Sequence, residues 1–339
     1  QIMTRNIVYS NSFFLPSRWW YILAMKGKKI RVGILFGGKS AEHEVSLQSA
    51  KNIAEVIDKD KYEVTLLGID KSGAWLLPNQ SAFLLNTNDS KLIQLNTTDK
   101  KDVALLPQSK GVLTYLTNEH REHVVDVVFP VLHGPFGEDG TVQGLLKLAG
   151  VPFVGASVLG SAVGMDKDVM KRLLRDAGIP IGKFLVYTQN DTIDFMGVSE
   201  KLGLPFFVKP ANLGSSVGVY KVKNKEEFDN AVRGVFQYDT KILIEEFIDG
   251  REVECGVLGN ENPNASEVGE IIPTHEFYSY EAKYIDEHGA KLEVPANISP
   301  EIREKVRALA LKTFRTLSCE GLGRVDFFLK KNGNIIVNE

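Results

Sequence analysis

A strand, helix and strand pattern near the start of the chain limits its architecture more than any other feature. Residues 29–36 are a short apolar run rich in β-branched side chains, and the run ends at Gly37 and Gly38. The next strand pattern covers residues 62–69. Between the strands, apolar residues recur at helical spacing: Leu47, Ala50, Ile53, Ala54 and Ile57. Because strands that alternate with helices usually lie parallel, the sequence predicts an α/β protein with a parallel sheet.

The composition is that of a globular protein with two or three domains. The chain has 339 residues, 43% hydrophobic and 24% charged, with a formal net charge of −3. Nucleic-acid-binding proteins usually carry a basic face, and the slightly negative net charge of this chain gives no sign of one. No apolar run in the chain reaches the roughly 18 residues needed to span a bilayer. With two cysteines, a disulfide framework is not expected. We therefore expect a cytoplasmic protein that binds neither nucleic acid nor membrane.

Both ends of the chain differ from the rest. Residues 1–27 have no apolar periodicity, and Pro16 and Arg18 interrupt their apolar stretch, which argues against a signal peptide. We expect this segment to be an extension outside the fold, with Met25 as the alternative start. The chain stops at Glu339, inside a strand pattern. We expect its last sheet to be cut short.

A first domain is predicted to end near residue 155. A strand pattern at 124–132 runs into the glycine-rich turn 133–140, and a helix at about 141–149 follows. The polar segment 71–123 is interpreted as an insertion with weak strand signals. After the first domain, helical spacing covers 167–177, and strand patterns cover 205–209, 217–222, 241–246 and 251–258, with antiparallel patterns dominating to the end.

Residues 33–40 match the phosphate-loop pattern G-x-x-x-x-G-K-S/T, but they are a poor candidate for a nucleotide site. That pattern binds phosphate through a loop of backbone N–H groups, whereas residues 34–36 are the centre of a predicted strand. Glu42 and Glu44 lie just beyond and would repel phosphate. A phosphate-loop NTPase is therefore the less favoured alternative.

The loop at residues 212–218 is a better candidate for phosphate binding. It joins two strand patterns, and its two glycines and two serines can close around a ligand and offer N–H and hydroxyl groups. Lys209, at the end of the preceding strand, can add a cation. An ordinary glycine–serine hairpin explains the loop equally well. Lys167, which opens the predicted helix, is either a second phosphate cation or a solvated lysine, and its position alone favours the solvated state.

Two other positions are ambiguous on their own. The buried run at residues 242–248 contains Glu245 and Glu246, and a carboxylate there could accept a hydrogen bond from an adenine amino group. Two exposed acids at a strand end would give the same pattern. His133 follows a strand at a glycine turn, where parallel sheets expose ligand-binding groups, but a structural histidine fits as well.

The end of the chain predicts a β-hairpin. Strand patterns at 324–329 and 334–339 flank an Asn-Gly pair, residues 332–333, which favours a two-residue type I′ turn. In that register Asp326 lies opposite Glu339. Two carboxylates that face each other across a strand pair repel, and a divalent cation such as Mg²⁺ would remove the repulsion.

Arg324 is expected on the same face of this hairpin, where it could neutralise a developing oxyanion or a phosphate. A longer turn would shift the register, and two unrelated surface acids would then explain the pattern. The hairpin thus predicts a metal and phosphate site with that simpler alternative left open.

Six short blocks of the chain form a recognisable series. In order they are 37–46 (GGKSAEHEVS), 133–140 (HGPFGEDG), 165–167 (MDK), 209–218 (KP and GSSVG), 280–284 (YEAKY) and 323–326 (GRVD). Together they resemble the D-alanine–D-alanine ligase family of the ATP-grasp superfamily. The similarity runs from about residue 28 to residue 339, and several blocks are specific to the ligases rather than to ATP-grasp proteins in general.

The resemblance implies an α/β protein with the ATP-grasp fold. An N-terminal Rossmann-like domain would cover residues 28–155, and two α+β domains, at 156–249 and 250–339, would sandwich ATP. The last domain would be truncated. Family members are commonly dimers, so a homodimer is expected.

The resemblance also implies an activity. ATP would phosphorylate the carboxylate of one D-alanine, and the amine of a second would attack the D-alanyl phosphate, giving D-alanyl-D-alanine for peptidoglycan synthesis. ATP and Mg²⁺ or Mn²⁺ would be needed. The implied catalytic residues are Glu42, Ser215, Tyr284 and Arg324, with Glu42 and His133 as substrate ligands and Asp326 and Glu339 as metal ligands. The implied nucleotide-binding residues are Lys167, Lys209, Ser216, Glu245, Ile248, Glu252 and Lys283.

Three alternatives remain besides this activity. Sister enzymes join D-alanine to D-lactate, although Tyr284 resembles the dipeptide-forming group. The phosphate-loop NTPase is the second. A non-catalytic nucleotide-binding remnant is the third, because the family has an asparagine metal ligand two positions beyond Glu339, where this chain has ended.

Overall fold

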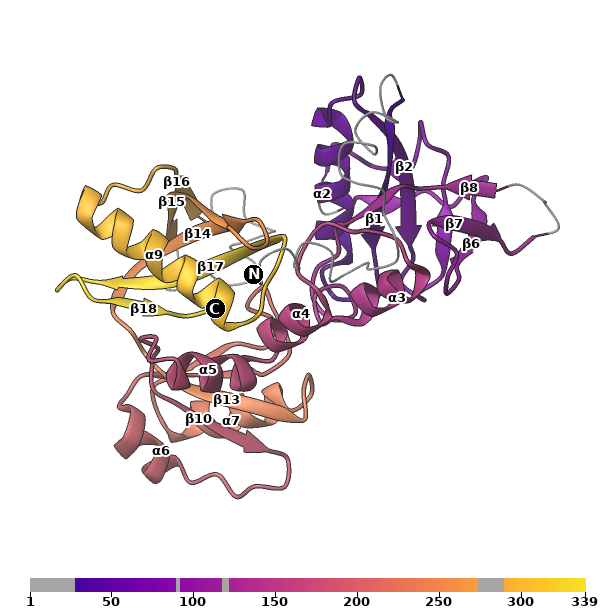
Figure 1. Ribbon diagram of the computed structural model, residues 1–339. Helices are drawn as coiled ribbons and strands as arrows, with labels where there is room; N and C mark the ends of the chain where they lie inside the picture. The colour runs from indigo at the N-terminus through magenta and orange to yellow at the C-terminus, as the bar shows by residue number, and fades with distance from the viewer. Residues whose placement is uncertain (1–27, 90–91, 118–121, 274–289) are drawn as a thin grey trace, which may run out of the picture. The chain divides into compact units, whose positions relative to one another are not determined.

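The computed structural model describes residues 28–339 except 90–91, 118–121 and 274–289. The chain forms two compact units (Figure 1). Unit 1 contains the described part of residues 1–133 together with 141–154, and unit 2 contains residues 134–140 and 155–339. Both units combine helices with β-sheets, as the sequence predicts.

The predicted parallel strands form one side of a seven-stranded sheet in unit 1. β1 (Ile30–Gly37) pairs in parallel with β2 (Tyr62–Ile69) and, on its other side, with β9 (Val127–Pro130). The other strands of this sheet are β3 (Trp75–Leu77), β6 (Lys101–Leu105), β7 (Val112–Tyr115) and β8 (Glu122–Val124). The spatial order is β8-β7-β6-β3-β2-β1-β9, and β4 (Leu84–Leu85) pairs separately with β5 (Gln94–Leu95).

Both faces of β1 are buried, which explains its uninterrupted apolar sequence. Ile34 belongs to one hydrophobic cluster with residues of α2 (His43–Val56), whereas Leu35 belongs to another with residues of α3 (Thr141–Ala149). The two helices predicted from apolar spacing in this unit are therefore confirmed, and each contributes to one cluster.

Residues 71–123, interpreted from the sequence as an insertion, instead continue the sheet. β3, β6, β7 and β8 follow β2 as successive antiparallel neighbours. Val103, Leu105 and Leu113 from this segment lie in the same cluster as Leu35. An antiparallel strand that buries one face alternates polar and apolar residues, so the segment looked too polar for a sheet.

The run at 124–132, predicted as one strand, contains parts of two strands at opposite edges of the sheet. β8 ends at Val124, and β9 begins at Val127. Between them, Asp126 is held by Arg31, whose Nη2 lies 2.6 Å from Oδ1 and whose backbone N–H donates to Oδ2 at 2.9 Å. Hydrogen bonding from the Arg31 side chain lowers the pKa of Asp126 below its ordinary value. This ion pair fixes the chain at the point where it changes edges.

Unit 2 contains two antiparallel sheets. The four-stranded sheet consists, in spatial order, of β10 (Phe184–Thr188), β13 (Lys241–Glu246), β11 (Phe206–Pro210) and β12 (Tyr220–Val222). The five-stranded sheet consists, in spatial order, of β16 (Ala290–Glu293), β15 (Asn264–Pro273), β14 (Gly250–Leu258), β17 (Leu322–Lys330) and β18 (Ile335–Val337). The predicted strands of this half of the chain all appear in these sheets.

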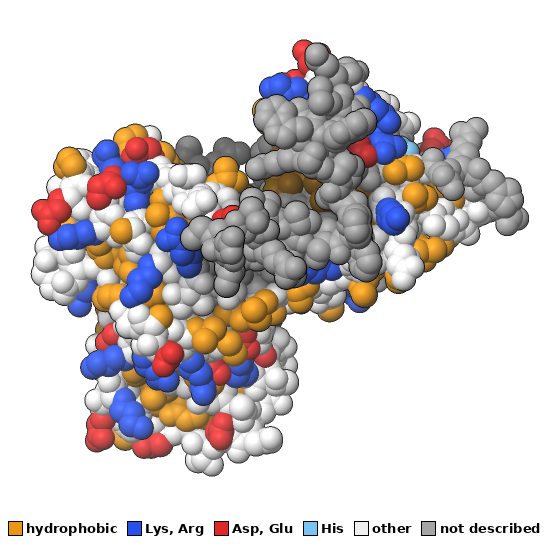
Figure 2. Space-filling view, viewed as in Figure 1, with side chains coloured by type: hydrophobic (Ala, Val, Ile, Leu, Met, Phe, Trp, Pro, Cys, Tyr) orange, Lys and Arg blue, Asp and Glu red, His pale blue; other side chains and the backbone are white. Residues whose placement is uncertain are grey.

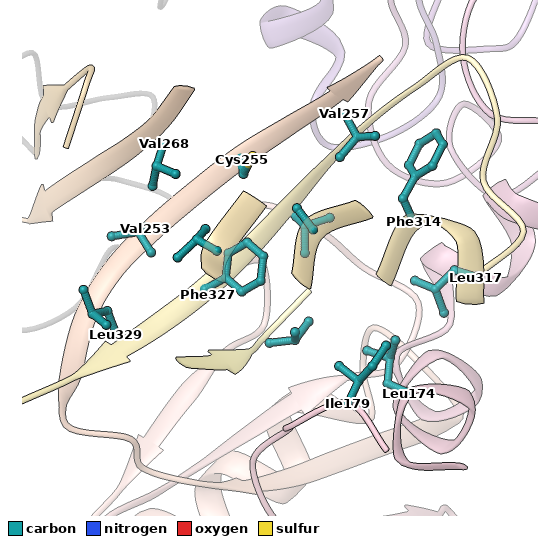
Figure 3. Close-up of a cluster of buried hydrophobic side chains, with 14 of the residues drawn as sticks. Leu174, Ile179, Val253, Cys255, Val257, Val268, Phe314, Leu317, Phe327 and Leu329 are labelled. Carbon is teal, nitrogen blue, oxygen red and sulfur yellow. The ribbon is translucent and has the colours of Figure 1, made fainter. Parts of the chain in front are cut away.

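Each sheet of unit 2 has its own hydrophobic core. Phe206 of β11 and Phe228 of α7 (Lys225–Val235) belong to the core of the four-stranded sheet, which also includes residues of α6 (Phe195–Leu202). Phe314, from the 17-residue helix α9 (Pro300–Thr316), lies with Phe327 and other side chains of β14 and β17 in the core of the five-stranded sheet (Figure 3). The sequence analysis predicted no helix in the region of α9.

Helix α5 (Lys167–Asp176) connects the two sheets of unit 2. Its Met170 and Leu174 lie in the core of the five-stranded sheet, where Leu174 is labelled in Figure 3. Its N-cap Asp166 accepts hydrogen bonds from two backbone N–H groups of the first turn and from Nζ of Lys241, the first residue of β13. These contacts connect the first turn of α5 to the four-stranded sheet, and the predicted helix is confirmed. Another helix, α4 (Val158–Met165), precedes it.

The C-terminal hairpin forms, but its predicted two-residue turn is wrong. Phe327 pairs with Val337, and the loop has three residues, 331–333, with Gly333 at φ +82°. Three-residue hairpin loops commonly end in a left-handed glycine, and the extra residue shifts the register by one. The backbone of Asp326 consequently forms hydrogen bonds with both Asn338 and Glu339, rather than pairing with Glu339 alone.

Charged side chains of both signs are interspersed over the visible face of unit 2 (Figure 2). Among the residues that the structure describes, none of the helices is both long and apolar enough to cross a membrane.

The Arg31–Asp126 pair predicts a pH-dependent contribution to stability. Because the folded-state pKa of Asp126 is lowered, its contribution is complete above the unfolded value of about 4 and is lost as the pH falls through the folded value. Asp126→Asn should reduce the free energy of unfolding at pH 7 by about 1 kcal/mol, because both side chains are about one-quarter exposed.

Urea unfolding at pH 7 and pH 3, followed by circular dichroism, measures this difference. The gap between the wild type and the variant should shrink at pH 3. Asp249→Asn, which removes a largely exposed carboxylate, is the matched control and should show no such change. A gap of equal size at both pH values would contradict the prediction.

Candidate active site

The first residue of α5 brings a cation into the interior of unit 2. Lys167 is 4% exposed, and its Nζ donates to the Leu213 carbonyl at 2.5 Å and lies 2.8 Å from Oε1 of Glu339. Its backbone N–H donates to the Ala211 carbonyl at 3.0 Å. The solvated state that position alone favoured is therefore wrong, because the loop after β11 and Glu339 cover the side chain.

A second group of buried charges surrounds Glu245 on β13. Nζ of Lys209 lies 2.6 Å from Oε2 of Glu245, and Nζ of Lys171 lies 3.2 Å from Oε1. Lys209 and Glu245 point to the same face of the four-stranded sheet, since Phe207 pairs with Glu245 and Lys209 is two residues further along β11. The alternative of an exposed acid at a strand end is wrong for Glu245, which is 8% exposed.

The electrostatic state of this group follows from competition between burial and charge. Burial disfavours the ionised carboxylate of Glu245, but the nearby ammonium groups of Lys171 and Lys209 outweigh it and leave its pKa below the ordinary value. Burial likewise lowers the pKa of Lys171, while Glu245 opposes that shift. The carboxylate is therefore ionised at neutral pH.

Lys171 is a residue that the sequence analysis missed. It is 2% exposed and lies one helical turn after Lys167, on the buried side of α5. The available signal was that Lys171 lies on the same side of the predicted helix as the apolar residues Met170 and Leu174, which is the side expected to face the core. A lysine at such a position is buried only with a partner, and that partner comes from a strand about seventy residues later in the sequence.

The loop between β11 and β12 has the hairpin connection that the sequence predicts. Its left-handed residues include Ser215 at φ +51° and Ser216 at φ +60°, together with Gly218 at φ +70°. Left-handed serines are uncommon and cost roughly 1 kcal/mol each, so the loop stores local strain. Asn212 is anchored by Asp239, whose Oδ2 accepts from its backbone N–H at 2.8 Å. The loop is thus fixed at its first residues.

The hairpin of β17 and β18 places two carboxylates next to two cations. Nε and Nη2 of Arg324 donate to the two carboxylate oxygens of Asp326, each at 2.7 Å, and Nε lies 3.2 Å from Oε2 of Glu254. Hydrogen bonding to Asp326 raises the pKa of Arg324. The Asp326 N–H donates to the Glu339 carbonyl at 2.8 Å, and Glu339 in turn pairs with Lys167.

Despite the shifted register, these contacts bring Arg324, Asp326 and Glu339 together. The alternative of two unrelated surface acids does not describe them. Within the described part of the chain, no cluster of three or more histidine, cysteine, aspartate or glutamate side chains is arranged to hold a metal ion. A Mg²⁺ ion at this hairpin would need phosphate oxygens beside the two carboxylates, which is how proteins usually hold Mg²⁺ with nucleotides.

Ile248 and Glu252 follow Glu245 along the connection from β13 into β14. Ile248 is half-buried between the two strands, and Glu252 lies in the first half of β14, paired with Phe328 on β17. The predicted residues Lys283 and Tyr284 lie outside the described residues.

In unit 1, Glu42 and His133 lie near each other, after the carboxyl ends of the parallel strands β1 and β9. Ser40 links them, because its Oγ donates to the His133 carbonyl at 2.7 Å and accepts from the Glu42 N–H at 3.1 Å. Glu42 is 5% exposed, and Nε2 of His133 lies 3.3 Å from Oγ of Ser49. Ligand sites of parallel sheets commonly occupy this edge.

The phosphate-loop pattern at residues 33–40 does not form a phosphate-binding loop. Ile34, Leu35 and Phe36 are fully buried within β1. Their backbone groups are used in pairing with β2 and β9. The structure thus agrees with the sequence-based assessment of this motif as a poor candidate for a nucleotide site.

The family comparisons agree with this geometry. The family model described as "D-ala D-ala ligase N-terminus" matches residues 31–156, and that described as "D-ala D-ala ligase C-terminus" matches residues 173–339. The D-alanine–D-alanine ligase of Oceanobacillus iheyensis is 54% identical over 314 residues, covering 92% of this chain and 86% of the relative. D-alanine–D-alanine ligase A of Escherichia coli K12 is 52% identical with the same coverage.

Solved structures give the same result for the fold. The D-alanine–D-alanine ligase of Coxiella burnetii superposes with a TM-score of 0.78 at 35% identity, covering 92% of this chain and 84% of that one. The VanG D-Ala:D-Ser ligase of Enterococcus faecalis superposes with a TM-score of 0.79 at 35% identity, covering 92% and 90%. The chain therefore belongs to the D-alanine–D-alanine ligase family and has its ATP-grasp fold.

Proposed function

We propose that this chain joins two D-alanines into D-alanyl-D-alanine, with conversion of ATP to ADP and phosphate, as a cytoplasmic step of peptidoglycan synthesis. The observation that carries the proposal is the set of buried lysines, Lys167, Lys171 and Lys209, between the two sheets of unit 2. Three ammonium groups there face two carboxylates, Glu245 and Glu339. This excess of positive charge supports binding of a nucleotide triphosphate.

The proposed nucleotide contacts come from α5, from the four-stranded sheet and from the start of β14. Lys167 and Lys209 bind phosphate oxygens, and the loop with Ser215 and Ser216 covers them. Glu245 accepts from the adenine amino group, while the backbone at Ile248 and the carboxylate of Glu252 bind the adenine and the ribose. Lys283 contacts the transferred phosphate. The burial of Lys167 and Lys209 supports their part, since a buried ammonium group needs an anionic partner and phosphate oxygens can serve as one.

The proposed metal ligands are Asp326 and Glu339, which hold Mg²⁺ or Mn²⁺ together with phosphate oxygens. The donor set fits, because both groups are carboxylates, their backbones are hydrogen-bonded to each other, and hard oxygen ligands suit these cations. When bound, the ion neutralises phosphate charge and polarises the transferred phosphoryl group. Arg324 and Lys167 must release the two carboxylates at least in part.

The proposed reaction has two balanced steps. A carboxylate oxygen of the first D-alanine attacks the γ-phosphorus, and the bond to ADP breaks. The neutral amine of the second D-alanine then attacks the carbonyl carbon, and phosphate leaves as the amide forms and the amine loses a proton. Arg324 stabilises the oxyanion of this second step. Glu42 binds the ammonium group of the first D-alanine, with His133 as a further substrate ligand, and Ser215 and Tyr284 are further catalytic residues.

We further propose three domains, at residues 28–155, 156–249 and 250–339, and a homodimer. The two sheets of unit 2 support the division after residue 249, because each has a separate hydrophobic core. D-lactate or D-serine is the alternative second substrate. The VanG neighbour, a D-Ala:D-Ser ligase, motivates the test of D-serine, but the D-alanine–D-alanine relatives have higher identity.

Measurement of ADP release with different acceptors tests the proposed reaction. D-alanine should stimulate ADP release by at least about tenfold over ATP alone, with L-alanine inactive, and mass spectrometry should detect one dipeptide per ADP. Mixtures of D-alanine with D-serine or D-lactate give the share of the alternative products. ATP turnover that is indifferent to D-alanine would contradict the ligase and favour an NTPase.

Asp326→Asn tests the proposed metal ligand. Removing one anionic ligand should raise the Mg²⁺ concentration needed for half-maximal ADP release by about tenfold, because the amide oxygen is a weaker ligand for a hard cation. Asp229→Asn on α7, whose carboxylate pairs with Lys225 on the same helix, is the control and should match the wild type. An unchanged Mg²⁺ dependence in Asp326→Asn would show that the metal is held elsewhere.

A further inference from the structure

The carboxylate of Glu245 has two lysine partners, although one would neutralise it. Lys171 approaches Oε1 from helix α5, and Lys209 approaches Oε2 from strand β11. Lys171, Lys209 and Glu245 are 2%, 8% and 8% exposed. Two buried ammonium groups thus share the one carboxylate that both contact, and Lys171 is attracted more weakly to Glu339, which itself pairs with Lys167. Such an arrangement suits the binding of a further anion.

The two lysines differ in how firmly they are placed. Lys171 is in the middle of α5, next to Met170 in the hydrophobic core, and its side chain has almost no access to solvent. Lys209 is the second-last residue of β11, directly before the loop that carries Ser215 and Ser216. Lys209 thus borders the loop that is proposed to cover the nucleotide phosphates, whereas Lys171 lies within the packed helix. Lys171 is therefore the fixed partner and Lys209 the exchangeable one.

Exchange of Lys209 has an electrostatic requirement. When Lys209 turns from Glu245 to a phosphate, the buried carboxylate loses its 2.6 Å partner. A buried carboxylate without a counter-ion is strongly destabilising, so a site with Lys209 alone would hold that lysine on Glu245 and away from the nucleotide. Lys171 removes this conflict, because it faces the other oxygen of the same carboxylate.

We propose that Lys171 is a positioning residue: it is the permanent counter-ion of Glu245, and it thereby frees Lys209 to bind the nucleotide phosphates. This inference rests on the proposed nucleotide site. Lys171 itself contacts no phosphate and acts only through Glu245. Nζ of Lys171 lies 3.2 Å from the buried Oε1 of Glu245, so it faces the carboxylate oxygen that Lys209 does not contact.

The lowered pKa of Glu245 is consistent with this arrangement, because the carboxylate stays ionised in spite of its burial. Repulsion from Lys209 contributes to the lowered pKa of Lys171, after the larger effect of burial. Departure of Lys209 toward a phosphate removes that repulsion and favours the charged form of Lys171 at the moment when Glu245 depends on it.

The test compares the binding of ADP and of adenosine, measured by isothermal titration calorimetry, in the wild type and four variants of the whole chain. In Lys171→Met, Lys209 should stay on Glu245, so the Kd of ADP should rise at least about tenfold, which is about 1.4 kcal/mol, while the Kd of adenosine changes less than about threefold. The KM for D-alanine should not change. Arg172→Met removes a neighbouring cation of α5 that pairs with Asp168, and it should bind both ligands as the wild type does.

The double variant Lys171→Met with Glu245→Gln provides the rescue. It removes both buried charges, so Lys209 is free again, and the glutamine carbonyl can still accept from adenine. ADP affinity should return to within about threefold of the wild type. If Lys171→Met alone does not fold, the double variant still tests the proposal, because Lys209 then has no buried carboxylate that could hold it away from ADP.

Three results would overturn the proposal: an unchanged ADP affinity in a folded Lys171→Met, equal losses for ADP and adenosine, or a double variant that binds adenosine but not ADP. The last result would mean that Lys171 contacts phosphate directly. Failure of the proposed nucleotide site is a separate outcome, since the wild type would then not bind ADP, or Lys209→Met would bind it unchanged.

Discussion

The buried charge pairs around helix α5 are the constraint on which the rest of unit 2 depends. Lys167 and Lys171, one turn apart on this helix, meet Glu339 from the end of the chain and Glu245 from β13. The helix can hold these charges in the interior only because carboxylates from both sheets reach it. These pairs stabilise the packing of the two sheets on α5. Lys209 also pairs with Glu245, so the region contains one more lysine than carboxylates, and this additional cation makes it suitable for phosphate.

Most of the secondary structure could be predicted because it depends on local pattern. β1 follows from its run of apolar, β-branched residues, and α2 and α5 follow from apolar residues at helical spacing. Helix α9 was missed although local signals for it are present, since Ser299 caps it, Pro300 opens it, and apolar residues recur every four positions from Ile302 to Phe314. The many charged residues between them obscured this stripe. The antiparallel strands of unit 1 escaped because they are short, and because β6 mixes buried with partly exposed residues.

The candidate site was harder to predict, because its partners come from distant parts of the sequence. The two-residue turn at residues 332–333 was the locally favoured one, yet a three-residue loop formed and changed the register. Asp326 and Glu339 still meet, because the backbone beyond the regular ladder adds its own hydrogen bonds. Lys171 could not be recognised without its partner Glu245. The phosphate-loop pattern in β1 was correctly rejected on the burial of its strand, which no motif match can override.

The most direct test of the account is a crystal structure of the full chain with ADP and Mn²⁺, whose anomalous signal locates the metal. The phosphates should lie within hydrogen-bonding distance of Nζ of Lys167 and Lys209, the adenine should lie beside Glu245, and the metal should contact Asp326 and Glu339. Nucleotide bound at residues 33–40 of unit 1, or phosphates that contact neither lysine, would contradict it.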